Sequence, residues 1–194
     1  TISKQDMNYS TIIGSSLIAV FSGLWYIGVF DTIKFHEGKI PAGKFVYKNH
    51  AGPMKDCGPY FSEIWELLKL HGVQEMYPTL GMFYEDPQTT PNPRYAVGFL
   101  VEAKYEQLYQ SIAKEFSAQG FLELKLKETK TLSTSFPLRA GIASYTLSAM
   151  KVYPAFMNKN LEMKCGSVEV YLKDTIVTHF PQENYELYLP QDSK

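Results

Sequence analysis

The chain has 194 residues, 45% of them hydrophobic and 20% charged, and its 19 basic side chains nearly balance its 20 acidic ones. This composition excludes a disordered chain, because enough apolar surface is available to offset the entropy of ordering. It also gives no overall positive charge that would attract a polyanion, so no nucleic-acid partner is expected.

The first long apolar segment runs from Tyr9 to Phe30 and contains no charged side chain. About 20 apolar residues in a helix cross the hydrocarbon core of a bilayer. We therefore predict a single-pass transmembrane helix over 9–30, preceded by a tail over 1–8. A signal peptide and a buried helix of a globular protein are the alternatives. More lysines follow this segment than precede it, which places the rest of the chain on the cytosolic side, or on the matrix side of a mitochondrial membrane.

Within this segment Ser15, Ala19 and Gly23 recur at every fourth position and form one stripe of small residues on a helix. Membrane helices pack closely through such stripes, so the pattern favours contact with the helix of another subunit. The alternative is a helix that faces lipid and carries small residues by chance.

The remaining elements follow a connector over 31–44. Strands are expected at 45–48, 79–84, 94–102, 121–136, 167–172, 175–180 and 185–189, and helices at 60–71, 105–118 and 139–158. In the first helix Phe61, Ile64, Trp65 and Leu68 lie on one face of a 3.6-residue period. Pro154 is expected to kink the last helix or to shift its last turn.

The order strand, helix, strand, strand occurs twice, with a helix inserted between the two modules. Hairpin strands separated by helices indicate an α+β fold with an antiparallel sheet. The sequence has no glycine-rich phosphate loop and no nucleophile-elbow motif.

The histidines and cysteines show no metal-ligand spacing, so neither a metal nor another cofactor is expected. Cys57 and Cys165 are read as two reduced, buried thiols, and a disulfide that closes a long loop stays the alternative.

Four stretches carry a family resemblance. HAGPMKDCGPYFSEIWELL at 50–68 and GMFYEDPQTTP at 81–91 resemble the GyrI-like family, and FPLRAGIASYTLSAMKVYPAF at 136–156 with VEVYLKDTIVTHFPQ at 168–182 resembles a membrane-anchored eukaryotic branch of it. The resemblance implies a GyrI-like domain over 45–190, followed by a tail over 191–194. It also implies two tandem modules that form one curved sheet, with the helices packed on one face.

In bacterial relatives a groove between the modules binds small hydrophobic or cationic molecules, and some relatives hydrolyse toxins. The glutamate on which those relatives rely matches Glu169. Alternation along the strand places Glu169 and Tyr171 on one face, and Trp65, Tyr84 and Tyr145 could add aromatic walls for a cation. A proton-exchanging, catalytic Glu169 and a glutamate that merely faces solvent are the alternatives.

The leading hypothesis from the sequence is a non-catalytic accessory subunit of a membrane protein complex. A groove-based binder or hydrolase of small hydrophobic or cationic molecules is the first alternative. An autophagy receptor of the endoplasmic reticulum is the second, although the long C-terminal tail of such receptors does not follow the domain here. The expected membrane is that of the endoplasmic reticulum by resemblance, or the mitochondrial inner membrane for a complex subunit.

Overall fold

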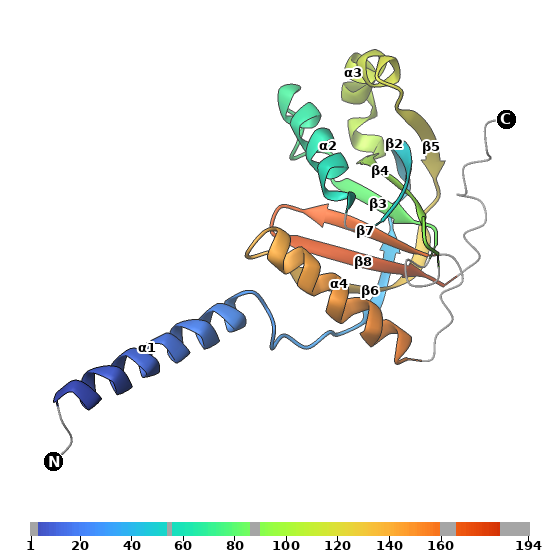
Figure 1. The fold of residues 1–194 in the computed structure, drawn as a ribbon. Coiled ribbons are helices and arrows are strands. Elements are labelled where there is room, and N and C mark those ends of the chain that lie inside the picture. Colours follow the sequence, from blue (N-terminus) through green and yellow to red (C-terminus); the bar gives the residue numbers. More distant parts are fainter. Residues whose placement is uncertain (1–3, 54–55, 86–89, 160–165, 183–194) are drawn as a thin grey trace.

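The computed structural model describes residues 4–53, 56–85, 90–159 and 166–182. It contains a curled antiparallel sheet with helices packed on its outer face and one helix, α1 (Lys4–Tyr26), that projects away from the sheet (Figure 1). The other elements, in chain order, are β1 (His36–Ile40), β2 (Gly43–Ala51), α2 (Gly58–Leu70), β3 (Thr79–Phe83), β4 (Arg94–Val101), the short 3-10 helix η2 (Ala103–Tyr105), α3 (Glu106–Ala118), β5 (Leu122–Leu126), β6 (Thr129–Pro137), α4 (Ile142–Met157), β7 (Ser167–Leu172) and β8 (Thr175–Pro181). The α+β class and the antiparallel pairing agree with the sequence prediction.

The predicted duplication appears directly in the strand order, β1-β6-β8-β7-β3-β4-β2-β5. The first module contributes β2, β4 and β3, the second contributes β6, β8 and β7, and the two meet where β3 pairs with β7. Two strands were not resolved by the sequence prediction: β1 lies within the range predicted as a connector, and the range 121–136 divides into β5 and β6. Strand β1, which precedes the first module, pairs with β6 of the second module, and β5, which follows the inserted helix α3, pairs with β2 of the first module.

This exchange of edge strands explains the curl of the sheet. Only Pro41 and Ala42 join β1 to β2, although the two strands lie near opposite ends of the strand order. A two-residue connection spans about 10 Å at most, so the two ends of the sheet must lie close together. Lys39 of β1 and Glu128, which lies between β5 and β6, form an ion pair at 2.7 Å there.

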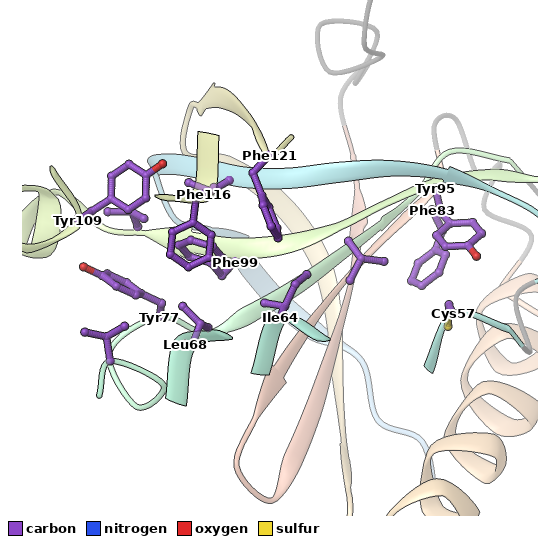
Figure 2. Packing of buried hydrophobic residues seen from close by; sticks show 14 residues of the cluster. Cys57, Ile64, Leu68, Tyr77, Phe83, Tyr95, Phe99, Tyr109, Phe116 and Phe121 are labelled. Carbon is purple, nitrogen blue, oxygen red and sulfur yellow. The ribbon is translucent and has the colours of Figure 1, made fainter. Parts of the chain in front are cut away.

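The core has two layers, one on each face of the sheet. Figure 2 shows the layer under α2 and α3, where Phe99 of β4 lies among the rings of Tyr77, Tyr109, Phe116 and Phe121. In α3, Tyr109 and Phe116 are buried, whereas Leu108 is 39% exposed. The second layer fills the concave side of the sheet with Phe45, Tyr47, Leu80, Met82, Leu100, Val168 and Val170, among others.

Local sequence sets the ends of the helices. Pro59 stands in the first turn of α2, where its missing N–H removes no helical hydrogen bond. Gly72, just past the end of this helix, has φ +68°, a conformation that glycine adopts without strain. Helix α4 contains Pro154 and continues to Met157, and a kink at this proline stays a prediction.

The prediction of a transmembrane helix over 9–30 is wrong. In the part of the chain that the structure describes, no helix combines the length and the apolar character needed to cross a bilayer. The helix ends at Tyr26, and Gly14, Ser15, Ser16 and Ser22 interrupt its apolar residues. The localisation that rested on this helix, in the endoplasmic reticulum or the mitochondrial inner membrane, is withdrawn with it.

Ser15, Ala19 and Gly23 are exposed on α1. In the described part of the chain, no atom other than the adjacent residues and the backbone of the helix itself would lie within 4 Å of a Cβ at Gly23. The hydroxyl of Ser15 donates to the carbonyl of Thr11 at 2.9 Å, as serines in helices often do. Contact of this stripe with a partner helix stays a prediction.

The chain that follows α1 is attached to the domain through α4. Lys151 Nζ donates to the backbone carbonyls of Gly28, Val29 and Asp31. Arg139, just before α4, lies 3.5 Å from the Asp31 carboxylate and donates to the Tyr26 carbonyl. A cation is favourable beside carbonyl groups at the C-terminal end of a helix, so these contacts fix where α1 leaves the domain.

Candidate functional site

Glu169 lies at the centre of the sheet, where the two modules meet. It sits on β7 directly opposite Gly81 of β3, and its side chain is only 2% exposed. Along β7, Val168 and Val170 pack in the concave layer, so Glu169 and Tyr171 face the side that carries α2 and α4. The sequence predicted correctly that these two residues share a face.

The carboxylate of Glu169 accepts two hydrogen bonds from tyrosines. Tyr171 OH donates to Oε2 at 2.7 Å, and Tyr153 OH, from α4, donates to Oε1 at 2.8 Å. The Tyr153 hydroxyl also lies 2.8 Å from Ser167 Oγ. Burial raises the pKa of Glu169 because the charged form loses its hydration, and the hydrogen bonds from Tyr171 and Tyr153 oppose this shift.

Aromatic side chains from both modules surround this carboxylate. The Phe61 ring of α2 lies 4.3 Å from the Tyr171 ring between centroids, and Tyr145 of α4 lies 6.0 Å from it on the same measure. The Tyr145 hydroxyl is 3.5 Å from the Cys57 thiol, which is free and fully buried. A Cβ on Gly81 would stand 2.8 Å from the Phe61 ring, so glycine is what allows this ring to lie over β3.

Of the five predicted ligand-binding residues, the structure brings three together and places the other two elsewhere. Glu169, Tyr171 and Tyr145 form one cluster. Trp65 stands on α2 with 41% of its surface exposed, and it lines a cleft on the other side of Tyr171. Tyr84 packs in the concave layer, across the sheet from Glu169. Its position is one residue past β3, so alternation along the strand turns it away from the cluster.

Sequence reasoning missed Phe61 and Tyr153 as members of the cluster. Phe61 was assigned to the apolar face of its helix, and nothing in its spacing distinguishes a residue over the core from one over the groove. Tyr153 lies between Val152 and Pro154 in α4, and no local pattern there marks it as part of a site. Its one available signal was its hydroxyl, because a buried tyrosine usually needs a hydrogen-bond partner.

The cleft beside Tyr171 has a volume of about 510 Å³. Trp65 of α2, Met76 of the loop before β3, Tyr105 of η2 and Leu172 of β7 line it together with Tyr171. The Tyr171 ring therefore separates this open cleft from the buried carboxylate, to which its hydroxyl donates.

Glu85 and His50 each have a structural contact. Glu85 accepts hydrogen bonds from the backbone N–H and the side-chain Nε of Arg94, at 2.8 and 3.0 Å. The ring of His50 stacks on that of Tyr60 at 3.6 Å between centroids. Among the described residues, no group of three or more acidic, histidine or cysteine side chains is arranged to hold a metal.

A second buried polar cluster lies on the concave face, at the end of the sheet opposite α2. His179 Nδ1 of β8 is 2.7 Å from Ser133 Oγ and 3.1 Å from Thr131 Oγ1, both of β6. Burial lowers the pKa of His179 to about 4, with a smaller contribution from His36. The imidazole is therefore neutral at pH 7, and its Nδ1 can accept a hydrogen bond from a hydroxyl.

Comparison with known proteins identifies the fold. Neither the protein-family models nor the curated proteins contain a match. Among solved structures, the DNA complex of EcmrR matches with a TM-score of 0.50 and 10% identity over 91% of this chain and 67% of that one. SAV2435 bound to tetraphenylphosphonium matches with a TM-score of 0.49 and 11% identity over 80% of this chain and 97% of that one. An integron cassette protein of Vibrio cholerae matches with a TM-score of 0.48 and 10% identity over 78% of this chain and 98% of that one.

These neighbours have GyrI-like folds, and the likeness to the EcmrR complex shows that this chain has that fold too. The resemblance read from the sequence is confirmed at that level. None of the comparisons points to the membrane-anchored eukaryotic branch.

Proposed function

We propose that this protein binds small apolar cations at Glu169. The observation that carries the proposal is a buried carboxylate whose charge is met by hydroxyl groups but, within the described residues, by no lysine or arginine in an ion pair. A buried charge without an opposite charge is costly, and a cationic ligand supplies that opposite charge.

The surroundings of the carboxylate suit the apolar part of such a ligand. Phe61, Tyr145 and Tyr171 present aromatic rings, and an aromatic face attracts a cation by its quadrupole. The rings cover Glu169 in this structure, so a ligand reaches the carboxylate by displacing Tyr171 or Phe61. SAV2435, a protein of similar fold, was solved with the apolar cation tetraphenylphosphonium, which makes that ion a suitable probe.

The hypothesis of an accessory subunit of a membrane complex has no support in the structure or the comparisons. The first alternative from the sequence, a groove that binds small molecules, explains the Glu169 cluster directly. Binding alone accounts for the arrangement, and the proposal includes no chemical step.

The decisive experiment compares two ions of the same shape and opposite charge. Calorimetric titration of the full chain with tetraphenylphosphonium should show binding, and titration with tetraphenylborate should not. Because binding requires the ionised carboxylate, the affinity should rise as pH increases through the raised pKa of Glu169.

Glu169→Gln tests the residue itself. This substitution removes the charge and keeps the size of the side chain, and it should weaken tetraphenylphosphonium binding at least tenfold and remove its pH dependence. Glu115→Gln, which removes an exposed carboxylate from α3, is the matched control and should bind as the parent does. Equal affinities for the two ions, or unchanged binding by a folded Glu169→Gln variant, would refute the proposal.

A further inference from the structure

The cleft beside Tyr171 arises from the unequal lengths of three neighbouring strands. β3 begins at Thr79, which pairs with Phe99 of β4 on one side and with Tyr171 of β7 on the other. Both neighbours run on past this level, β4 to Val101 and β7 to Leu172. Beyond Thr79 no strand of the described residues lies between them, and the loop before β3 lines the gap. The cleft of about 510 Å³ opens in this notch, and its size is that of a site for a drug-sized molecule.

The walls of the cleft are largely apolar and partly exposed. Trp65, Met76 and Leu172 line it with 41%, 37% and 49% of their surfaces exposed, and the ring of Tyr105 adds a further aromatic surface. Flat aromatic molecules gain both apolar burial and ring stacking against such walls.

One polar atom in the wall lacks a partner. Gln74 Oε1 is buried and accepts no hydrogen bond from the part of the chain that the structure describes. A buried acceptor without a donor costs free energy, which a ligand recovers by donating an N–H or O–H group. Because this oxygen has almost no accessible surface, a ligand reaches it only when the Gln74 side chain turns toward the cleft, and the oxygen then selects for a donor on the ligand.

The charges around the cleft select against a net charge on the ligand. Glu75 and Glu102 bring two carboxylates, and Lys104 and Lys173 bring two ammonium groups. Glu102 and Lys104 already form an ion pair at 3.0 Å. The balanced lining contrasts with the Glu169 site, where one negative charge stands alone.

We infer that this cleft is a second binding site, which takes a flat, uncharged aromatic molecule whose N–H group donates to Gln74 Oε1. It does not use Glu169 and goes beyond the proposed binding of cations there. The two sites adjoin through Tyr171, whose ring lines the cleft and whose hydroxyl donates to Glu169.

Carbazole and 9-methylcarbazole are suitable probes, because both are flat and uncharged and a methyl group replaces the N–H hydrogen in the second. Their binding to the full chain is measured by the anisotropy of their own fluorescence. The chain has two tryptophans, Trp25 and Trp65. In a Trp25→Phe background, quenching of the remaining tryptophan reports whether the probe lies beside Trp65.

The parent protein should bind carbazole about tenfold more tightly than 9-methylcarbazole, the effect of one hydrogen bond to a buried acceptor. Gln74→Leu should bring this ratio close to one. Gln119→Leu, at the exposed end of α3, is the matched control and should keep the preference. Trp65→Leu should weaken both probes and leave their ratio unchanged, which tests the site without altering Gln74.

Equal affinity of the parent for the two probes, no binding of carbazole, or a preference that survives Gln74→Leu would overturn the inference. Loss of carbazole binding in Glu169→Gln would also overturn it, because the cleft would not then be a separate site. Failure of tetraphenylphosphonium to bind would refute the proposed function alone and leave carbazole binding unaffected.

Discussion

Acid should destabilise this protein through His179, and the size of the effect follows from its environment. The side chain is 7% exposed, and burial lowers its pKa from 6.5 to about 4. Ser133 and Thr131 surround Nδ1 with hydroxyl groups, to which a neutral imidazole is well suited. In the unfolded chain the same histidine takes up a proton near pH 6.5.

The sign of the effect follows from which state binds the proton. Between pH 6.5 and about 4 the unfolded chain is protonated at His179 and the folded protein is not, so lowering the pH favours unfolding. The stabilisation is complete above pH 6.5 and is lost as the pH falls through this range. At about 1.4 kcal/mol for each pKa unit, the loss amounts to about 3 kcal/mol.

Urea unfolding at a series of pH values between 4 and 8 measures this effect when the parent is compared with His179→Asn. Asparagine places its Oδ1 near the position of Nδ1 and does not titrate, so the difference in unfolding free energy between the two proteins isolates His179 from all other groups. We expect the parent to lose about 3 kcal/mol relative to the variant between pH 7 and pH 4. Parallel pH profiles for the two proteins would show that His179 titrates normally and that this reasoning is incorrect.

Three further predictions concern the core and its edges. Gly166→Ala should lower the unfolding free energy by more than about 2 kcal/mol, because φ is +74° and a Cβ would collide with the Phe83 carbonyl. Gly120→Ala is the control and should cost only about 1 kcal/mol, because φ there is +82° but a Cβ meets no described atom outside the adjacent residues within 4 Å. Equal losses of the two variants in urea titrations would contradict this. Phe99→Ala should cost about 3–5 kcal/mol, since four aromatic rings lose their common neighbour, and a loss below about 1 kcal/mol would argue against the described packing. In a Cys165→Ser background, where Cys57 is the one remaining thiol, Cys57 should react with a thiol reagent at pH 8 far more slowly in the native protein than in urea. Burial raises the pKa of this thiol and excludes the reagent. Equal reaction rates in the two conditions would count against its burial.

The sequence predicted the repeated module because periodicity reports burial on one face. Phe61, Ile64 and Leu68 marked α2, and the alternation at 167–172 marked β7, without reference to any distant residue. The same signal failed at β1, His36–Ile40, because only Ile40 of its five residues is fully buried. That strand is held by pairing with β6, a contact between residues about a hundred positions apart.

The incorrect transmembrane helix has a related cause. Absence of charge over 9–30 was read as apolar character, although serines and glycines contribute little to transfer into a bilayer. The prediction based on the absence of charge was therefore a longer and more apolar helix than the structure contains. The end of α1 is set by tertiary contacts with Lys151 and Arg139, which a local pattern cannot contain.

Only the part of the candidate site that follows from the alternation of side chains along a single strand could be predicted from the sequence. Glu169 and Tyr171 were paired correctly, because residues two apart on a strand must share a face. The sequence prediction assigned Tyr84 to the same site by its aromatic character. Side chains alternate between the two faces along β3, and this alternation places Tyr84 on the opposite face. Tyr153 and Gln74 act through neighbours from other elements, so their roles depend on how α4 and the loop before β3 are placed against β7.

The two buried titratable groups show why Glu169, and not His179, is the one to test for ligand binding. Burial disfavours the charged form of both. A histidine resolves this conflict by staying neutral, and the hydroxyl groups beside His179 satisfy the neutral ring. A glutamate at neutral pH has no such resolution unless it keeps its proton, and the two tyrosines that donate to Glu169 favour the ionised form instead. Burial still raises the pKa of Glu169 in spite of these two hydrogen bonds, so the charged form carries a cost that a cationic ligand would offset.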